Sequence, residues 1–192
     1  MSFSADELAD RALGAFWKGG YNATSMDALV KSTGVSRHAI YATFGGKKGL
    51  FQACFARYQA LVVTPAFSVV EEADADLYSI AAYFETQIAG AEAAGLPGPG
   101  CFVANTATEV APHDADANAR VAEHNDRLRR GFHHALTNAS TAGTVPAAAT
   151  ALADVCVVFA NGLWSMSRVT NDAGTLRQSV DLFLGMIREE LS

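Results

Sequence analysis

The stretch from Thr24 to Leu50, TSMDALVKSTGVSRHAIYATFGGKKGL, determines how this chain is interpreted. Thr24 followed by Asp27 predicts a capping box at the start of a short helix. Gly34 predicts the end of that helix, because glycine adopts a left-handed backbone at little cost. Ser36 then predicts the cap of a second short helix. Helix, tight turn and helix in this order are typical of a helix-turn-helix, whose second helix lies in the DNA major groove.

The second helix has two faces of different character. Ile40 and Phe44 are four residues apart and are expected in the core. The outward face is then expected to read DNA, with Arg37 suited to guanine and His38 to base acceptors. The alternative is a helical hairpin in an ordinary all-α core with solvated charges. We predict DNA contacts from Thr24, Ser25, Ser36, Arg37, His38, Tyr41, Thr43, Lys47 and Lys48.

The distribution of charge supports the DNA-binding interpretation. The chain of 192 residues carries a formal net charge of -6, which by itself argues against a nucleic-acid binder. Between residues 19 and 58, however, five basic residues stand against Asp27 alone, a local charge of +4. A basic face on an acidic body attracts phosphate at one place only.

The first fifty residues resemble the amino-terminal domain of the TetR family of bacterial repressors. The motifs that carry the resemblance are Gly20-Tyr21, Thr24-Ser25, Gly34-Val35-Ser36, Ile40-Tyr41, Phe44, Lys47 and Leu50. The resemblance implies a homodimeric one-component regulator. It also implies a helical carboxy-terminal body that binds a small-molecule inducer and the partner subunit.

The fold class is therefore expected to be all-α with about nine helices and no strand. We expect residues 1–48 to form the helix-turn-helix DNA-binding domain and residues 49–192 to form the ligand-binding and dimerisation domain. Periodicity and glycine or proline signals predict the helices. Their expected ranges are 4–18, 47–64 ended by Pro65, 77–94, 101–111, 114–139, 147–170 and 175–191, with a loop from Thr141 to Pro146.

The inducer cavity is assigned through the family resemblance. Its candidates mix aromatic rings with a few polar groups, which suits small ligands. They are Tyr83, Phe84, Gln87, Phe102, Asn105, Thr106, Glu109, His133 and Trp164. The alternative for each aromatic residue is ordinary core packing. Asn105, Glu109 and His133 are the better candidates, because polar groups near an apolar interior need partners.

The last two helices carry more apolar positions than one core seam needs. The resemblance implies a four-helix bundle built from two helices of each subunit. The alternative is that these faces are buried within one subunit. The predicted dimer contacts are Val155, Phe159, Gly162, Met166, Val180, Phe183, Leu184 and Ile187.

The three cysteines, Cys54, Cys101 and Cys156, suit reduced thiols better than a disulfide framework. Cys101 stands at an expected helix start, where partial positive charge favours the thiolate. It is therefore a candidate sensor thiol. The alternative, which is favoured, is that Cys101 packs as a small hydrophobe beside Phe102 and Val103.

No enzyme motif is found: the Walker, GxSxG, HExxH and CxxC patterns are absent. We predict no catalytic residue, no cofactor and no metal site, because no histidine pair has the i, i+4 spacing of two ligands on one face. No apolar run is judged to approach a membrane span, and the first residues do not resemble a signal peptide. The expected location is the cytoplasm, with no membrane partner.

Two functional hypotheses follow. The first is a ligand-responsive repressor that binds a palindromic operator as a dimer and releases it when a small molecule binds the body. The second is a ligand-independent DNA-binding or architectural dimer, with an electrophile or oxidant sensor acting through Cys101 as a further alternative. The inducer, the operator and the regulated genes do not follow from the sequence.

Overall fold

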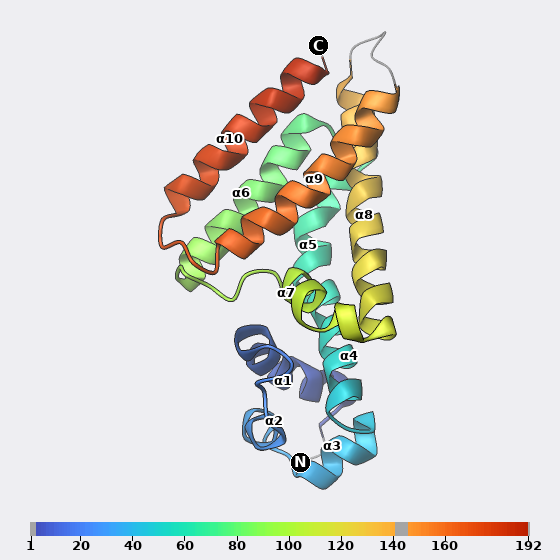
Figure 1. Ribbon diagram of the computed structural model, residues 1–192, viewed down its shortest axis with the longest axis vertical. Helices are drawn as coiled ribbons and strands as arrows, with labels where there is room; N and C mark the ends of the chain where they lie inside the picture. Colours follow the sequence, from blue (N-terminus) through green and yellow to red (C-terminus); the bar gives the residue numbers. More distant parts are fainter. Residues whose placement is uncertain (1–2, 141–145, 192) are drawn as a thin grey trace. The chain divides into compact units, whose positions relative to one another are not determined.

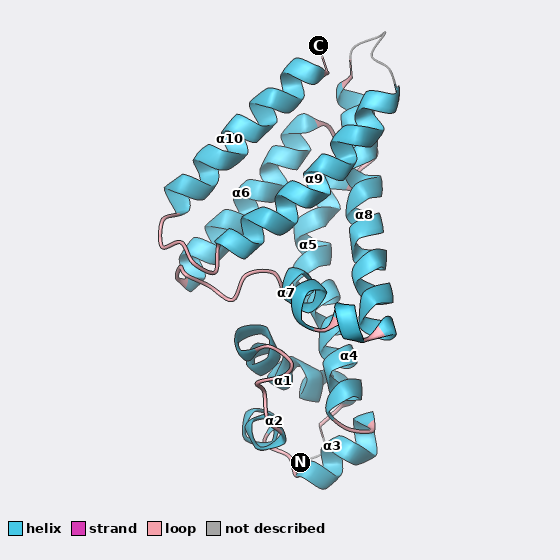
Figure 2. Cartoon of the chain, in the orientation of Figure 1, coloured by secondary structure: helices cyan, strands magenta, loops and turns pink. Residues whose placement is uncertain are grey.

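The computed structural model describes residues 3–140 and 146–191, and every regular element in these ranges is helical (Figures 1 and 2). The α-helices are α1 Ala5–Gly19, α2 Met26–Thr33, α3 Arg37–Phe44, α4 Lys47–Tyr58, α5 Thr64–Phe67, α6 Leu77–Ala94, α7 Phe102–Glu109, α8 Ala115–Ala139, α9 Pro146–Met166 and α10 Ala173–Glu190. A π-helical turn, Gln59–Val63, joins α4 to α5. Single 3₁₀ turns follow at Ser68–Val70 and Ala111–His113.

The all-α prediction is confirmed for the described residues, which contain nine helices when Lys47–Val70 is counted as one. The predicted range of α6 matches its observed bounds, because Asp76 caps it and Gly95 ends it. Most of the loop predicted from Thr141 lies outside the described residues.

Two helix starts show how capping fixes the chain. At α1 the predicted capping box is confirmed: Glu7 N–H donates to Ser4 Oγ at 3.2 Å and Ser4 N–H donates to Glu7 Oε2 at 2.7 Å. At α2 the prediction is wrong by one residue. Ser25 is the cap, accepting from Ala28 N–H at 3.1 Å. Thr24 is buried, and its hydroxyl donates to the backbone oxygen of Gly20 at 2.5 Å instead.

The expectation that Pro65 ends the fourth helix is also wrong. The chain continues helically to Val70. Just before the proline, Thr64 N–H donates to the oxygen of Gln59, five residues back, instead of the usual four. Such a wide turn relieves the clash between a proline ring and the carbonyl of the preceding turn. The helical segment therefore continues through Pro65, although proline normally ends a helix.

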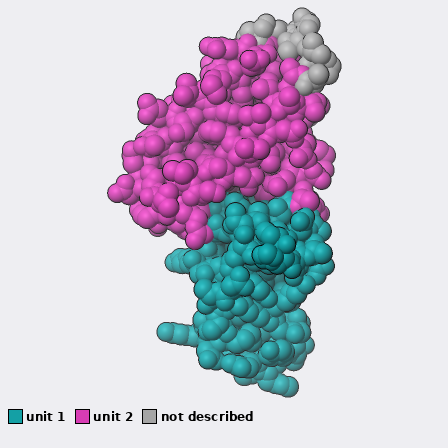
Figure 3. Space-filling model, viewed as in Figure 1, with its two compact units in different colours: residues 1–64, 101–121 teal, residues 65–100, 122–192 magenta. Residues whose placement is uncertain are grey.

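The chain forms two compact units, coloured separately in Figure 3. Unit 1 comprises Met1–Thr64 and Cys101–Val121, so α7 and the first residues of α8 belong with the helix-turn-helix. Its core is aromatic: the Phe51 ring lies 5.2 Å from those of Phe16 and Phe102. Residues far apart in sequence thus meet around the first turns of α4.

Unit 2 comprises Pro65–Gly100 and Ala122–Ser192. In it α10 packs along α6, as Figure 1 shows. Phe84 of α6 is fully buried at the centre of a ring cluster. The other members of the cluster are Tyr83, Phe132, Phe159, Trp164 and Phe183.

Two segments, Lys47–Val70 and Ala148–Met166, are long and apolar enough to cross a membrane by length and composition alone. The expectation that no run comes near this length is therefore corrected. Core helices of soluble proteins pass the same test, and the first segment begins with two lysines.

His124 of α8 supplies a pH-dependent part of the stability. It is 6% exposed, and burial lowers the pKa of its imidazole from 6.5 to about 4. Between these values the unfolded chain binds a proton that the folded chain does not, so stability falls as the pH falls.

We therefore expect wild-type protein to lose about 2–3 kcal/mol of unfolding free energy between pH 7 and pH 4.5 that a His124→Gln variant does not lose. Urea unfolding of both proteins at the two pH values measures this difference. An identical loss in both would show that His124 does not contribute.

Candidate nucleic-acid interface

The turn between α2 and α3 is held by its own short side chains. Gly34 has φ +74°, the left-handed region, and its N–H donates to the Val30 oxygen at 3.0 Å. Ser36 then caps α3 by accepting from Ala39 N–H at 3.2 Å. Thr33 is fully buried and its hydroxyl donates to the Leu29 oxygen at 2.7 Å. These hydrogen bonds end α2, begin α3 and define the tight turn between the two helices.

The buried and exposed sides of α3 agree with the sides predicted from the sequence. Ile40 is fully buried and Phe44 is half-buried, so the helix is anchored through that side. The predicted reading residues Arg37, His38, Tyr41 and Thr43 are all exposed. Tyr41 is 53% exposed, which leaves part of its side chain available to a partner.

Arg37 takes part in an ion pair that sequence reasoning missed. Its Nη2 lies 2.9 Å from Oδ1 of Asp27, and both side chains are well exposed. An ion pair between such exposed groups contributes roughly 0–1 kcal/mol. A phosphate or a guanine can therefore replace Asp27 at small cost.

Thr24, Ser25 and Ser36, three of the short hydroxyl residues predicted to touch DNA, differ in exposure. Ser25 and Ser36 are exposed and accept cap hydrogen bonds, so each hydroxyl can still donate to phosphate. Thr24 is 5% exposed, and its hydroxyl already donates inside unit 1. Its role in the structure is to close the turn after α1.

The two lysines at the start of α4 have different partners. Lys47 Nζ lies 4.5 Å from the centre of the Tyr21 ring and 3.4 Å from the Asn22 oxygen, to which it donates. Partial burial lowers the pKa of Lys47, while the charge of Glu109 raises it. Lys47 is the first residue of α4, whose cap, Gly46, has no side chain to accept a hydrogen bond from the first N–H groups. These N–H groups and the lysine together favour a phosphate.

Lys48 is engaged by the start of α8. Its Nζ lies 2.8 Å from Oδ2 of Asp114 and 2.9 Å from Oδ2 of Asp116, and these bonds raise the pKa of Lys48. Asp114 also caps α8 by accepting from Ala117 N–H at 3.0 Å. Lys48 thus joins α4 to α8, which the sequence alone did not indicate.

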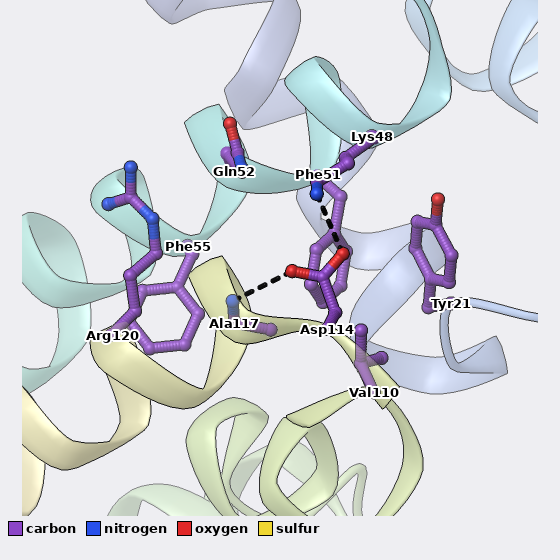
Figure 4. Close-up of a pocket in the computed structure, with 9 residues that line it drawn as sticks. All are labelled: Tyr21, Lys48, Phe51, Gln52, Phe55, Val110, Asp114, Ala117 and Arg120. Atoms are coloured by element: carbon purple, nitrogen blue, oxygen red, sulfur yellow. Dashed lines mark hydrogen bonds and ion pairs between the residues drawn. The ribbon is translucent and has the colours of Figure 1, made fainter. Parts of the chain in front are cut away.

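A hollow in unit 1 lies beside this ion pair (Figure 4). Its cavity volume is about 10 Å³, room for about one water molecule, and it is partly open to solvent. Phe51 and Phe55 give it apolar walls, and Figure 4 shows Asp114 between Lys48 and the Ala117 backbone. The lining residues are Tyr21, Lys48, Phe51, Gln52, Phe55, Val110, Asp114, Ala117 and Arg120. None of them is among the predicted inducer contacts.

Comparison with known proteins decides the family. The model described as bacterial regulatory proteins, tetR family, matches residues 8–54. The tetracyclin repressor-like carboxy-terminal domain matches residues 77–183, more than half of the chain. This chain belongs to the TetR family. The resemblance predicted from the sequence is thereby confirmed.

Two relatives of this TetR-family chain are named as transcriptional regulators. The transcriptional repressor ComR of Escherichia coli is 29% identical over 149 residues, covering 75% of this chain and 69% of ComR. An uncharacterised transcriptional regulator of Bacillus subtilis, YezE, is 28% identical over 196 residues, covering 96% of each chain.

Solved TetR structures share the fold. The regulator CifR, a cysteine mutant solved with 26-base-pair double-strand operator DNA, has a TM-score of 0.81 at 21% identity, covering 96% of this chain and 97% of that chain. The regulator SCO4454 of Streptomyces coelicolor has a TM-score of 0.80 at 15% identity, covering 97% of this chain and 94% of that chain. TetR-family regulators bind operator DNA and are soluble, and the two apolar helices fit such a core.

The predicted inducer contacts of this TetR chain divide between the two units. Phe102, Asn105, Thr106 and Glu109 belong to unit 1. Phe102 packs on Phe51, the Thr106 hydroxyl donates to the Phe102 oxygen at 2.8 Å, and Glu109 accepts two backbone hydrogen bonds. In unit 1 these three side chains serve packing and the ordering of the turn after α1.

The remaining inducer candidates belong to unit 2. Tyr83, Phe84 and Trp164 are buried in the ring cluster around Phe84. Gln87 and His133 are half-buried. The three rings are packed in the core, as the alternative interpretation expected. The side chains of Gln87 and His133 are partly exposed and could still contact a small molecule.

The predicted dimer contacts also fall into two groups. Val180, Phe183, Leu184 and Ile187 of α10 are between 1% and 7% exposed within the single subunit, so they form its own core. On α9, Val155 is 49% exposed and Met166 is 55% exposed, Gly162 is open to solvent, and Phe159 is half-buried against Phe183.

The structure argues against an activated thiolate at Cys101. Cys101 does stand at the cap position of α7, but burial raises the pKa of its thiol and outweighs the hydrogen bonds that lower it. Cys54 and Cys156 are fully buried, and burial raises the pKa of each to about 12. All three cysteines therefore have the character of packing residues.

Proposed function

We propose that this chain is a ligand-responsive one-component repressor, which binds a palindromic operator as a homodimer and releases it when a small molecule binds the carboxy-terminal body. The observation that carries this proposal is the exposed face of α3, Arg37 to Thr43, beside the uncapped start of α4. The arrangement is what base reading flanked by phosphate contacts requires. The family of the chain and its relation to ComR, named a repressor, support it.

The homodimer is supported by an apolar face that the subunit leaves exposed. On α10, Leu182 is 68% exposed and Met186 is 54% exposed; on α9, Val158 is 72% exposed. Leu182 and Met186 are four residues apart and share one face of their helix. Exposed apolar side chains on both of the last two helices support an interface with another protein. A second copy of this chain, presenting the same two helices, would bury them.

Arg37 and Lys47 are expected to differ in what they contribute to operator binding. An Arg37→Ala variant should relax sequence preference, because a base-edge contact is lost. A Lys47→Gln variant should keep its preference but show a salt slope smaller by about 1, because one phosphate contact is lost. A duplex selected from a random library with the wild-type protein, titrated at several salt concentrations, provides the measurement. Failure to select any duplex would contradict operator binding itself.

Ligand release is the part of the proposal with a rival. The rings around Phe84 fill space within unit 2, and this favours a regulator whose body only dimerises. Adding a low-molecular-weight bacterial extract to the protein–duplex complex separates the two. If the extract dissociates the wild-type complex but not the complex of a Gln87→Ala variant, an inducer site is supported. If no fraction of the extract dissociates the wild-type complex, the rival is supported.

A further inference from the structure

Glu109, the last residue of α7, binds the backbone of a turn that is far away in the sequence. Its Oε2 accepts from Tyr21 N–H at 2.9 Å, and its Oε1 accepts from Asn22 N–H at 2.7 Å. Each carboxylate oxygen thus takes one backbone donor in a charge-assisted hydrogen bond, the stronger kind. Two N–H groups of the turn that follows α1 are satisfied by a side chain nearly ninety positions away.

The turn is shaped to receive this carboxylate. Gly20 has φ +79°, which only glycine adopts without strain. A Cβ at Gly20 would lie 2.7 Å from Oε2 of Glu109, closer than van der Waals contact permits. The chain therefore needs glycine here for backbone conformation and for space.

The same turn holds Lys47. Its ammonium group rests on the ring of Tyr21 and donates to the backbone oxygen of Asn22. These are the two residues whose N–H groups Glu109 binds. The ammonium group of Lys47 thus contacts the turn, and the turn is bonded to Glu109 of α7.

We propose that Glu109 is a positioning residue for the DNA-binding surface: it fixes the turn 20–22 from α7 and, through that turn, holds Lys47 where it meets a phosphate. This inference rests on the operator binding argued under Proposed function. Displacement of α7 would release the turn and remove one phosphate contact.

The chain leading into α7 offers a source for such displacement. The segment before α7 is bonded to the end of α9: Gly98 N–H donates to the Ser167 oxygen at 3.0 Å, and Arg168 Nη1 donates to the Pro99 oxygen at 3.2 Å. Gly100, with φ +71°, leaves no room for a Cβ against Arg168. The end of α9 thus holds the segment 98–100, which is joined through the chain to Cys101 at the start of α7.

The test is a double-mutant cycle with Glu109→Gln and Lys47→Gln on the duplex selected by wild-type protein. Glu109→Gln should weaken binding about 10-fold and lower the salt slope by about 1, because a charge-assisted pair of bonds is lost and the lysine is no longer held. In the Lys47→Gln background the same change should cost less than about 3-fold. Equal losses in both backgrounds, or an unchanged salt slope in Glu109→Gln, would overturn the proposal.

Controls separate positioning from a general loss of structure. Glu92→Gln removes a carboxylate that pairs with Arg177 in unit 2 and should leave affinity and salt slope unchanged. Amide ¹⁵N shifts of Tyr21 and Asn22 should move in Glu109→Gln and not in Glu92→Gln. If Glu109→Gln fails to fold, Glu109→Asp keeps the charge with a shorter reach and should give an intermediate loss. If wild-type protein selects no duplex, the proposed function has failed rather than this inference.

Discussion

A Leu182→Glu, Met186→Glu double variant is expected to be monomeric and to bind the operator at least about 100-fold more weakly than wild type. Both side chains are more than half exposed on one face of α10. Inside a dimer interface they would be buried, and four glutamates brought together there would repel one another without solvent. A monomer retains one reading head and loses the contacts to the second half-site.

Light scattering and duplex titration on the same preparations measure both parts of this prediction. The matched control is Tyr78→Glu, which places a charge on an exposed apolar residue of unit 2, 76% exposed, outside the α9 and α10 faces. It should remain dimeric and bind normally. A dimeric double variant, or a wild-type protein that is monomeric at about 10 μM, would show that this face is not the interface.

The sequence did not predict which apolar residues of α10 are exposed. Periodicity correctly identified α10 as apolar on more than one side, but it gives only angles around the helix axis. It does not say which side meets α6 of the same subunit. The structure buries Phe183 and Ile187 inside the subunit and leaves Leu182 outside. A charge at Phe183 is therefore expected to disturb folding rather than only dimerisation.

Local signals predicted the local structure well. Ser4 with Glu7, Gly34 and Ser36 are each used as the sequence indicates, because caps and left-handed turns depend on a few adjacent residues. The error at Thr24 arose because two neighbouring hydroxyl residues, Thr24 and Ser25, can both serve as a cap. Only the buried position of Thr24 distinguishes them.

Contacts between distant segments could not be predicted. Glu109 was predicted as an inducer contact because a polar group near an apolar interior needs partners, and the partners it has in the structure lie in the turn after α1. Lys48 was assigned to phosphate, yet it binds two aspartates of the α8 start. Without the fold, nothing in the sequence pairs a lysine with carboxylates more than sixty positions away.

The second large effect concerns Phe84, which was predicted to line the inducer pocket. The ring is fully buried, and the centres of five other rings lie between 5.1 and 6.5 Å from its own. Aromatic neighbours at these separations add to the free energy of burial. Removal of the ring leaves a cavity that rigid neighbours cannot fill.

A Phe84→Ala variant is therefore expected to lower the free energy of unfolding by about 3–5 kcal/mol. Urea unfolding at one fixed protomer concentration measures it, since association contributes to apparent stability. Tyr78→Ala on the same helix, where the side chain is 76% exposed, should stay within about 0.5 kcal/mol of wild type. A loss below about 1 kcal/mol for Phe84→Ala would mean that the ring faces an accessible cavity, and the inducer pocket would then belong at α6.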